Sequence, residues 1–212
     1  MCVWIQVIGL ESFQTLTDEV VMSHIKKHVF GLRTMDRRAF AGAKLVVITE
    51  SNFSALFAER VASFLGKNPD TFGPVECIYQ PVKRNGVMAK RYGVVTTHAK
   101  KEAYVIQTVD ALTMDRLMFA QQGVCADGPN AWHRNKDKLI RQMAAYRSEI
   151  KVPTDQTHGT FRQSFTGKGG NQKDDLAMAF QINLYHTREL LRDPQFLRRC
   201  GTRFMAQRPG DL

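Results

Sequence analysis

The sequence predicts an α/β layered sheet, because short strand patterns alternate with longer helical patterns along the chain. The run KLVVIT at 44–49 is apolar and β-branched without alternation, which is typical of a strand buried on both faces of a sheet. Apolar residues then recur at helical spacing from 53 to 65 and complete one strand–helix unit. Since the chain has 212 residues, of which 43% are hydrophobic, we expect one compact domain.

The remaining elements follow the same two patterns. Short apolar and β-branched runs predict strands at 3–10, 75–79 and 159–165. Apolar residues at helical spacing predict helices at 17–31, 100–111, 135–150 and from 174 to just before Pro194. Thr17 is expected to cap the first helix, and Ser51 or Asn52 the helix that follows 44–49. The stretch QQGVCADGPNAW at 121–132 is expected to be a loop.

The chain is strongly basic, with thirty Lys and Arg residues against twenty Asp and Glu and a formal net charge of +10. Such a surface favours nucleic acid as a partner, because each neutralised phosphate releases condensed counterions. No apolar stretch approaches the roughly 20 residues of a membrane span, and no secretory leader is evident. The four cysteines are scattered without CxxC spacing, which indicates a reducing intracellular compartment and no zinc site.

One segment combines the basic charge with a turn signal. Asn85-Gly86 lies between two basic dipeptides and predicts a β-hairpin. A basic β-ribbon fits along a DNA groove, although an ordinary exposed hairpin has the same pattern. The candidate DNA-binding residues of this hairpin and of the helix that follows it are Lys83, Arg84, Lys90, Arg91, Lys100 and Lys101.

Three carboxylates stand where a metal centre can form. Glu50 closes the buried strand 44–49, and Asp174 and Asp175 open the last long helix. Two-metal phosphodiester cleavage needs several carboxylates that converge on ions about 3.5–4 Å apart. The alternative is that Glu50 is an ordinary acid after a strand and the aspartates serve only the helix N-terminus, which favours acids in any case.

Two motifs resemble the nuclease domain of the large subunit of herpesvirus-type DNA-packaging terminases. VVITESNFSALFAERVASFL at 46–65 is similar to the family's strand ending in Val-x-Glu-x-Asn and its amphipathic helix. FTGKGGNQKDDLAMAFQINLY at 165–185 is similar to its Gly-Lys, polar loop, Asp-Asp-Leu and helix ending in Tyr. HAKKEAYVIQTVDALTMDRLMFA at 98–120 resembles the family's Lys-rich helix and the short extended segment after it. The resemblance covers most of residues 1–190.

This resemblance implies an RNase H-like mixed sheet flanked by helices, and a Mg²⁺- or Mn²⁺-dependent endonuclease that cuts concatemeric double-stranded viral DNA with two ions. It implies that Glu50 and Asp174 or Asp175 are metal ligands, with either aspartate as the primary one, and that Lys168 steadies a phosphate. The implied setting is a packaging motor in the host nucleus, with other terminase subunits and the capsid portal as partners.

The chain departs from the family at its start. WIQVIGLESF at 4–13 resembles the third strand of the family's sheet, so the first strand, which carries another catalytic Asp, has no counterpart. We therefore expect residues 1–192 to form a nuclease domain truncated at its N-terminus, and 193–212 a basic tail. No GxxxxGK[ST] loop is present, so the family's ATPase and the first strands would come from elsewhere. The alternative function is a non-catalytic DNA-binding or motor-assembly module.

Overall fold

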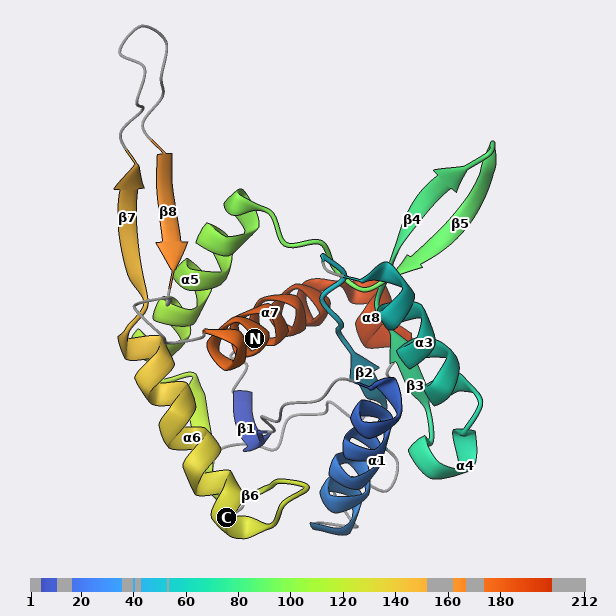
Figure 1. The fold of residues 1–212 in the computed structure, drawn as a ribbon, viewed down its shortest axis with the longest axis horizontal. Helices are drawn as coiled ribbons and strands as arrows, with labels where there is room; N and C mark the ends of the chain where they lie inside the picture. The colour runs from blue at the N-terminus through green and yellow to red at the C-terminus, as the bar shows by residue number, and fades with distance from the viewer. Residues whose placement is uncertain are drawn as a thin grey trace, which may run out of the picture.

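Helices and strands alternate along the chain, as the sequence predicts (Figure 1). The computed structural model describes residues 5–10, 17–35, 40, 43–52, 54–151, 162–166 and 174–199. The strands are β1 (Ile5–Gly9), β2 (Leu45–Val47), β3 (Val75–Cys77), β4 (Tyr79–Arg84), β5 (Val87–Tyr92), β6 (Leu117–Val124), β7 (Arg147–Lys151) and β8 (Arg162–Thr166). The helices are α1 (Asp18–Met35), α3 (Ala55–Gly66), α4 (Pro69–Phe72), α5 (His98–Thr113), α6 (Pro129–Ala144), α7 (Asp175–Arg192) and α8 (Pro194–Arg199).

The described strands form four separate pairs. β1 pairs with β6 and β2 with β3, both in parallel, while β4–β5 and β7–β8 are antiparallel hairpins. In Figure 1 the two parallel pairs lie on either side of a central region that α7 crosses, with β1 and β2 on the inner side of each pair. Among the described residues, nothing pairs with the inner edges of β1 and β2.

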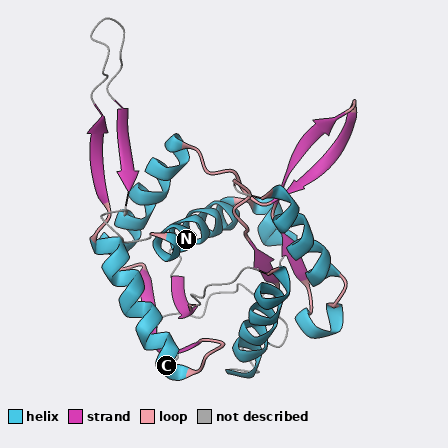
Figure 2. Cartoon of the chain, viewed as in Figure 1, coloured by secondary structure: helices cyan, strands magenta, loops and turns pink. Residues whose placement is uncertain are grey.

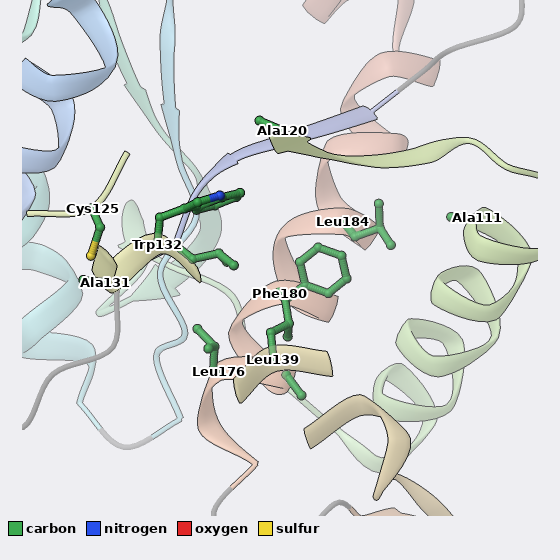
Figure 3. Packing of buried hydrophobic residues seen from close by; sticks show 11 residues of the cluster. Ala111, Ala120, Cys125, Ala131, Trp132, Leu139, Leu176, Phe180 and Leu184 are labelled. Atoms are coloured by element: carbon green, nitrogen blue, oxygen red, sulfur yellow. The ribbon is translucent and has the colours of Figure 1, made fainter. Parts of the chain in front are cut away.

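The largest buried cluster lies where α6 and α7 pack together. Trp132 and Leu139 of α6 are fully buried and face Leu176, Phe180 and Leu184 of α7 (Figure 3). A second cluster joins α1, α3 and α4 around Val61, Leu65 and Phe72. Burial of these apolar surfaces is the main force that holds α7 in place, and α7 begins at one of the predicted carboxylates.

Several element boundaries differ from the sequence prediction. The helix expected at 135–150 begins at Pro129 and ends at Ala144, and β7 then takes up the rest of that segment. Proline at the first helical position, after Gly128, explains the early start. The loop expected at 121–132 is therefore wrong at both ends, because Gln121 to Val124 belong to β6. The first helix runs past Gly31 to Met35.

The predicted hairpin is confirmed as β4–β5, which projects from the body of the molecule (Figure 2). Its turn residues Asn85 and Gly86 have φ values of 48° and 82°, as a type I′ turn requires of both central residues. The Asn-Gly pair is therefore what sets the register, with Arg84 opposite Val87.

The helix α8 lies within the predicted basic tail. Phe196 of α8 is buried, and α8 packs against α7. Residues 200–212 lie outside the described part of the chain, so the division into a domain at 1–192 and a basic tail at 193–212 stays a prediction. Within the described residues, none of the helices has the length and apolar character that crossing a membrane requires.

Candidate active site

Glu50 sits in an extended segment that continues β2 and pairs with Val94. The backbone N–H of Ser51 donates to the Val94 carbonyl at 2.9 Å, and the N–H of Val94 donates to the Thr49 carbonyl at 2.8 Å. These bonds fix the backbone on both sides of Glu50, whose side chain is half-buried. The strand that the sequence placed at 44–49 therefore delivers Glu50 at its end, although its regular part is only Leu45–Val47.

Asn52 connects the same segment to the part of the chain that follows β5. Its side-chain amide donates to the Thr96 carbonyl at 2.8 Å, and its carbonyl oxygen accepts from the Thr96 N–H at 2.7 Å. The sequence prediction that Ser51 or Asn52 caps the next helix is wrong, because Ser54 caps α3 by accepting from the Phe57 N–H at 3.0 Å. The Asn52 side chain instead pairs with the Thr96 backbone, as a neighbouring strand would, and this pairing fixes the loop beside Glu50.

Asp174 stands immediately before α7 and is 6% exposed. Its side chain makes no capping bond with the first turn of α7, where Gln142 of α6 instead accepts from the Ala177 N–H at 2.9 Å. Burial raises the pKa of Tyr146 to about 12, and the negative charge of Asp174 adds to that rise. Asp174 is therefore buried and its charge acts on Tyr146, whereas Asp175 is exposed.

The packing of α7 connects the two acidic segments to the same buried cluster. Met178 and Ile182 lie four and eight residues after Asp174, on one helical stripe, and they form a buried cluster with Val94 and Tyr104. Val94 is the residue that pairs with Glu50. Glu50 and Asp174 are thus linked to one small apolar cluster through Val94 and Met178, while Asp175 belongs to the stripe of the exposed residues Ala179 and Asn183.

A group of polar and aromatic side chains lies beside Glu50. Tyr104 is fully buried, and its hydroxyl is 3.4 Å from Nε2 of His186. Burial raises the pKa of Tyr104, and the charge of Glu50 contributes to the rise. The Lys100 ammonium donates to the Val95 carbonyl at 3.0 Å. Burial lowers the pKa of His186, and the charge of Lys100 lowers it further.

The lowered pKa of His186 gives a testable dependence of stability on pH. Below the ordinary value of 6.5, the unfolded chain takes up a proton that the folded chain resists, so this histidine contributes stability above that pH and loses it on acidification. We expect His186→Phe to fold and to show a shallower fall in the free energy of unfolding between pH 7 and pH 5, measured by urea titration. His98→Phe, which removes an exposed histidine, is the matched control; equal slopes for His186→Phe and the unchanged chain would contradict the assignment.

The structure places the predicted site residues unevenly. Glu50 pairs with Val94 and the Met178 N–H donates to the Asp174 carbonyl, so each is joined to a residue of the Val94 cluster, but no group of three or more metal-ligating side chains occurs within the described ranges. Lys168 falls outside the described residues. Carboxylate oxygens are the ligands that Mg²⁺ and Mn²⁺ prefer, so the donor type fits such an ion, while two carboxylates are fewer than a two-metal centre uses.

Sequence reasoning missed the side chains that surround these carboxylates. The contacts of Asn52 with Thr96, of Tyr104 with His186 and of Gln142 with Ala177 each join residues more than 30 positions apart. No local pattern encodes such a contact. The one available signal was the helical spacing of Met178, Ile182 and Tyr185 from Asp174, which marks a second buried face of α7.

The fold is similar to that of a known nuclease domain. A manganese-soaked structure of the human cytomegalovirus terminase nuclease domain matches with a TM-score of 0.60 and 13% sequence identity, over 92% of this chain and 74% of that one. No protein-family model matches the chain, and no curated protein matches it in sequence. The chain therefore has the fold of the human cytomegalovirus terminase nuclease domain, which confirms the α/β fold expected from the sequence.

Proposed function

We propose that the chain is the metal-dependent endonuclease module of a viral DNA-packaging terminase and that it cuts concatemeric double-stranded DNA. The observation that carries this proposal is that Glu50 and Asp174 are each bonded to a residue of one buried cluster, Val94 and Met178 respectively, within a fold shared with a terminase nuclease domain. The proposed setting is a packaging motor in the host nucleus, together with other terminase subunits, the upstream ATPase and the capsid portal.

Glu50 and Asp174 are the proposed metal ligands on this chain. Two divalent ions, when bound, would stabilise the attacking and leaving oxygens of a phosphodiester. The chain contributes orientation, because the hydrogen bonds at Val94 and Thr96 fix the backbone beside Glu50 and helix packing fixes Asp174. A further carboxylate is needed and would come from the first strand that the family resemblance implies.

Asp175 and Lys168 take secondary parts in this proposal. Asp174 is the better partner for Glu50, because it shares a helical stripe with Met178 and Ile182, whereas Asp175 is exposed on another side of α7. Asp175 would bind an ion only from that side. Lys168, from the Gly-Lys motif, would steady a DNA phosphate as a point charge.

The β4–β5 hairpin is the proposed DNA contact. Lys83 and Lys90 are exposed and lie diagonally on one face of the ribbon, since Lys83 pairs with Met88 and Lys90 with Pro81. The Lys90 ammonium lies 4.5 Å from the centre of the Tyr79 ring on the same face. A two-stranded ribbon enters the major groove of B-DNA, and lysines on such a ribbon reach the phosphates.

The other proposed DNA-binding residues are less available. Arg91 is half-buried, Lys100 is bonded to the Val95 carbonyl, and Lys101 is half-buried on α5. Nothing is described of the Arg84 side chain. We therefore propose Lys83 and Lys90 as the main contacts of this set.

Replacing both Lys83 and Lys90 by alanine tests the hairpin. The slope of log K against log salt is negative, and each lost phosphate contact makes it shallower by about 0.9. The double variant should therefore make it shallower by about 1.8 and should weaken binding equally for unrelated duplexes. Fluorescence anisotropy with two duplexes of different sequence measures both quantities.

The control for the hairpin variant carries the same change of charge elsewhere. Lys26 and Lys27 are exposed on α1, away from the hairpin (Figure 1). Lys26→Ala with Lys27→Ala should change the slope by much less. Equal effects of the two double variants would show that the hairpin lysines act only through net charge.

The nuclease proposal is tested with the chain expressed as its gene encodes it, including any segment that splicing joins to it. Supercoiled plasmid should be converted to nicked and linear forms in the presence of Mn²⁺ or Mg²⁺, and EDTA should abolish the conversion. DNA binding without cutting under all metal conditions would overturn the proposal.

The second candidate is a non-catalytic DNA-binding or motor-assembly module. It is favoured by one observation, namely that no three metal-ligating side chains gather within the described residues. The plasmid assay separates the two functions, since the module would bind DNA as the hairpin predicts and leave the plasmid intact.

A further inference from the structure

The β4–β5 hairpin presents two large apolar side chains at its projecting tip (Figure 2). Val87 and Met88 directly follow the turn and are 69% and 66% exposed. The charge around them is wholly positive, because the segment 79–92 contains two lysines, two arginines and no acidic residue. Exposed apolar groups gain free energy when a partner covers them, and a positive surface selects an anionic partner. An anionic partner that has apolar groups of its own therefore fits this tip.

The two faces of the hairpin carry these apolar side chains separately. Side chains alternate between the faces along each strand, and residues that pair across the ribbon share a face. Met88 pairs with Lys83 and lies two residues before Lys90, so it stands between these lysines on one face. Val87 pairs with Arg84 and lies on the opposite face. The face that carries the two lysines thus presents one large apolar group between its charges.

The position of Lys90 leaves Met88 accessible. The Lys90 ammonium lies 4.5 Å from the centre of the Tyr79 ring. Tyr79 pairs with Tyr92 at the base of the hairpin, and their rings meet edge to face at 6.2 Å. Lys90 therefore leans toward the body of the molecule and away from the tip. An approaching partner meets the Met88 side chain before it meets the Lys90 ammonium.

We infer that Met88 contacts thymine methyl groups in the major groove when the hairpin binds DNA. The inference rests on the proposed DNA contact of Lys83 and Lys90. The floor of the major groove carries the polar edges of the bases and one kind of apolar group, the C5 methyl of thymine. When the two lysines bind phosphates at the groove walls, the apolar side chain between them faces that floor. Phosphate contacts position a protein and base contacts discriminate between sequences, so Met88 gives a preference for thymine.

Methionine suits a graded preference better than a fixed recognition site. Its unbranched side chain has three rotatable bonds and a polarizable sulfur, so it adapts to methyl groups at different positions in the groove. It offers no strong hydrogen bond to a base edge. Burial of one methyl group changes an affinity about fourfold, and this factor is the size of the preference that we expect.

Three duplexes of one sequence test this inference by fluorescence anisotropy, with the whole chain and with EDTA present so that no DNA is cut. The first contains thymine. The second has uracil in place of every thymine, which removes only the C5 methyl groups. The third keeps uracil and has 5-methylcytosine in place of cytosine, which returns methyl groups to the same groove. We expect the second duplex to bind about fourfold more weakly than the first, and the third to recover this loss.

Two variants at the tip complete the test. Met88→Ala should bind the three duplexes with equal affinity, because it removes the side chain that reaches the methyl groups. Val87→Ala is the matched control, since it shortens an equally exposed apolar side chain on the opposite face, and it should keep the fourfold difference. Both side chains are exposed, so thermal unfolding followed by circular dichroism should be the same for both variants and for the unchanged chain.

Three results would overturn the inference: equal affinity of the unchanged chain for the thymine and uracil duplexes, a difference that survives Met88→Ala, or a difference that Val87→Ala also removes. The proposed function is judged by other measurements, namely the salt dependence of the Lys83 and Lys90 double variant and plasmid nicking. A chain that binds DNA through these lysines without distinguishing thymine from uracil contradicts only the inference. A chain that distinguishes them without cutting contradicts only the nuclease proposal.

Discussion

Replacing Glu50 by glutamine lowers the rate of metal-dependent plasmid nicking by at least about 100-fold, because loss of a direct ligand should exceed the roughly 10–100-fold cost of losing an outer partner. Glutamine keeps the size of the side chain and removes its charge, so the backbone bonds at Val94 and the bonds of the Asn52 side chain to Thr96 persist. The fold is thus retained while an ion loses a ligand. Glu102→Gln, an exposed change of the same kind on α5, is the control and should cut normally.

The aspartates extend the same prediction. Asp174→Asn should match Glu50→Gln, and Asp175→Asn should reduce nicking much less, because only Asp174 lies on the stripe with Met178 and Ile182. The double variant Glu50→Gln with Asp174→Asn should be little worse than either single variant, since members of one catalytic unit are strongly non-additive. Nicking that survives both single variants would remove these residues from the site, and a larger loss at Asp175 would reverse the assignment.

The sequence predicted those parts of the site that depend on local patterns. The apolar run 44–49 placed Glu50 at a strand end, helical spacing placed Asp174 and Asp175 together at the start of the last long helix, and Asn85-Gly86 placed the hairpin turn. Each of these signals is complete within about 20 residues. The sequence could not predict that Asn52 pairs with Thr96 or that Gln142 caps α7. A side-chain amide can cap a helix, pair with a strand backbone or face solvent, and only its distant neighbour decides which of these occurs.

The strand pairs were not predictable either, because they join distant segments. β6 follows α5 after a short turn and has a mixed sequence, LMFAQQGV, so its strand character depends on parallel pairing with β1 more than 100 residues earlier. The boundary of α6 was misjudged because Trp132 reads as part of a polar loop until its burial against α7 is known. Long-range packing thus decided the elements that local propensity left open.

Replacing Gly93 by alanine should destabilise the chain by about 2–5 kcal/mol, the sum of about 1–2 kcal/mol for a left-handed backbone and about 1–3 kcal/mol for overpacking. Gly93 has a φ of +87° and donates its N–H to the Ile78 carbonyl at 2.8 Å. A Cβ at this position would lie 2.7 Å from the Thr49 carbonyl oxygen and 3.1 Å from Cβ of Ser51. Both contacts fall on the segment that carries Glu50, and a backbone carbonyl cannot turn aside as a flexible side chain can.

Gly128→Ala separates the two contributions to this cost. Gly128 has nearly the same φ, +89°, but a Cβ there would meet nothing within 4 Å. Urea titration should therefore show a smaller loss of stability for Gly128→Ala, by about the 1–3 kcal/mol of the overpacking contribution. Because relief of the Gly93 contact must move Thr49 or Ser51, Gly93→Ala should also slow plasmid nicking under conditions where it remains folded, while Gly128→Ala should not. Equal stability losses for the two variants would mean that the backbone beside Glu50 yields freely, and the rigid placement of that carboxylate would then have to be abandoned.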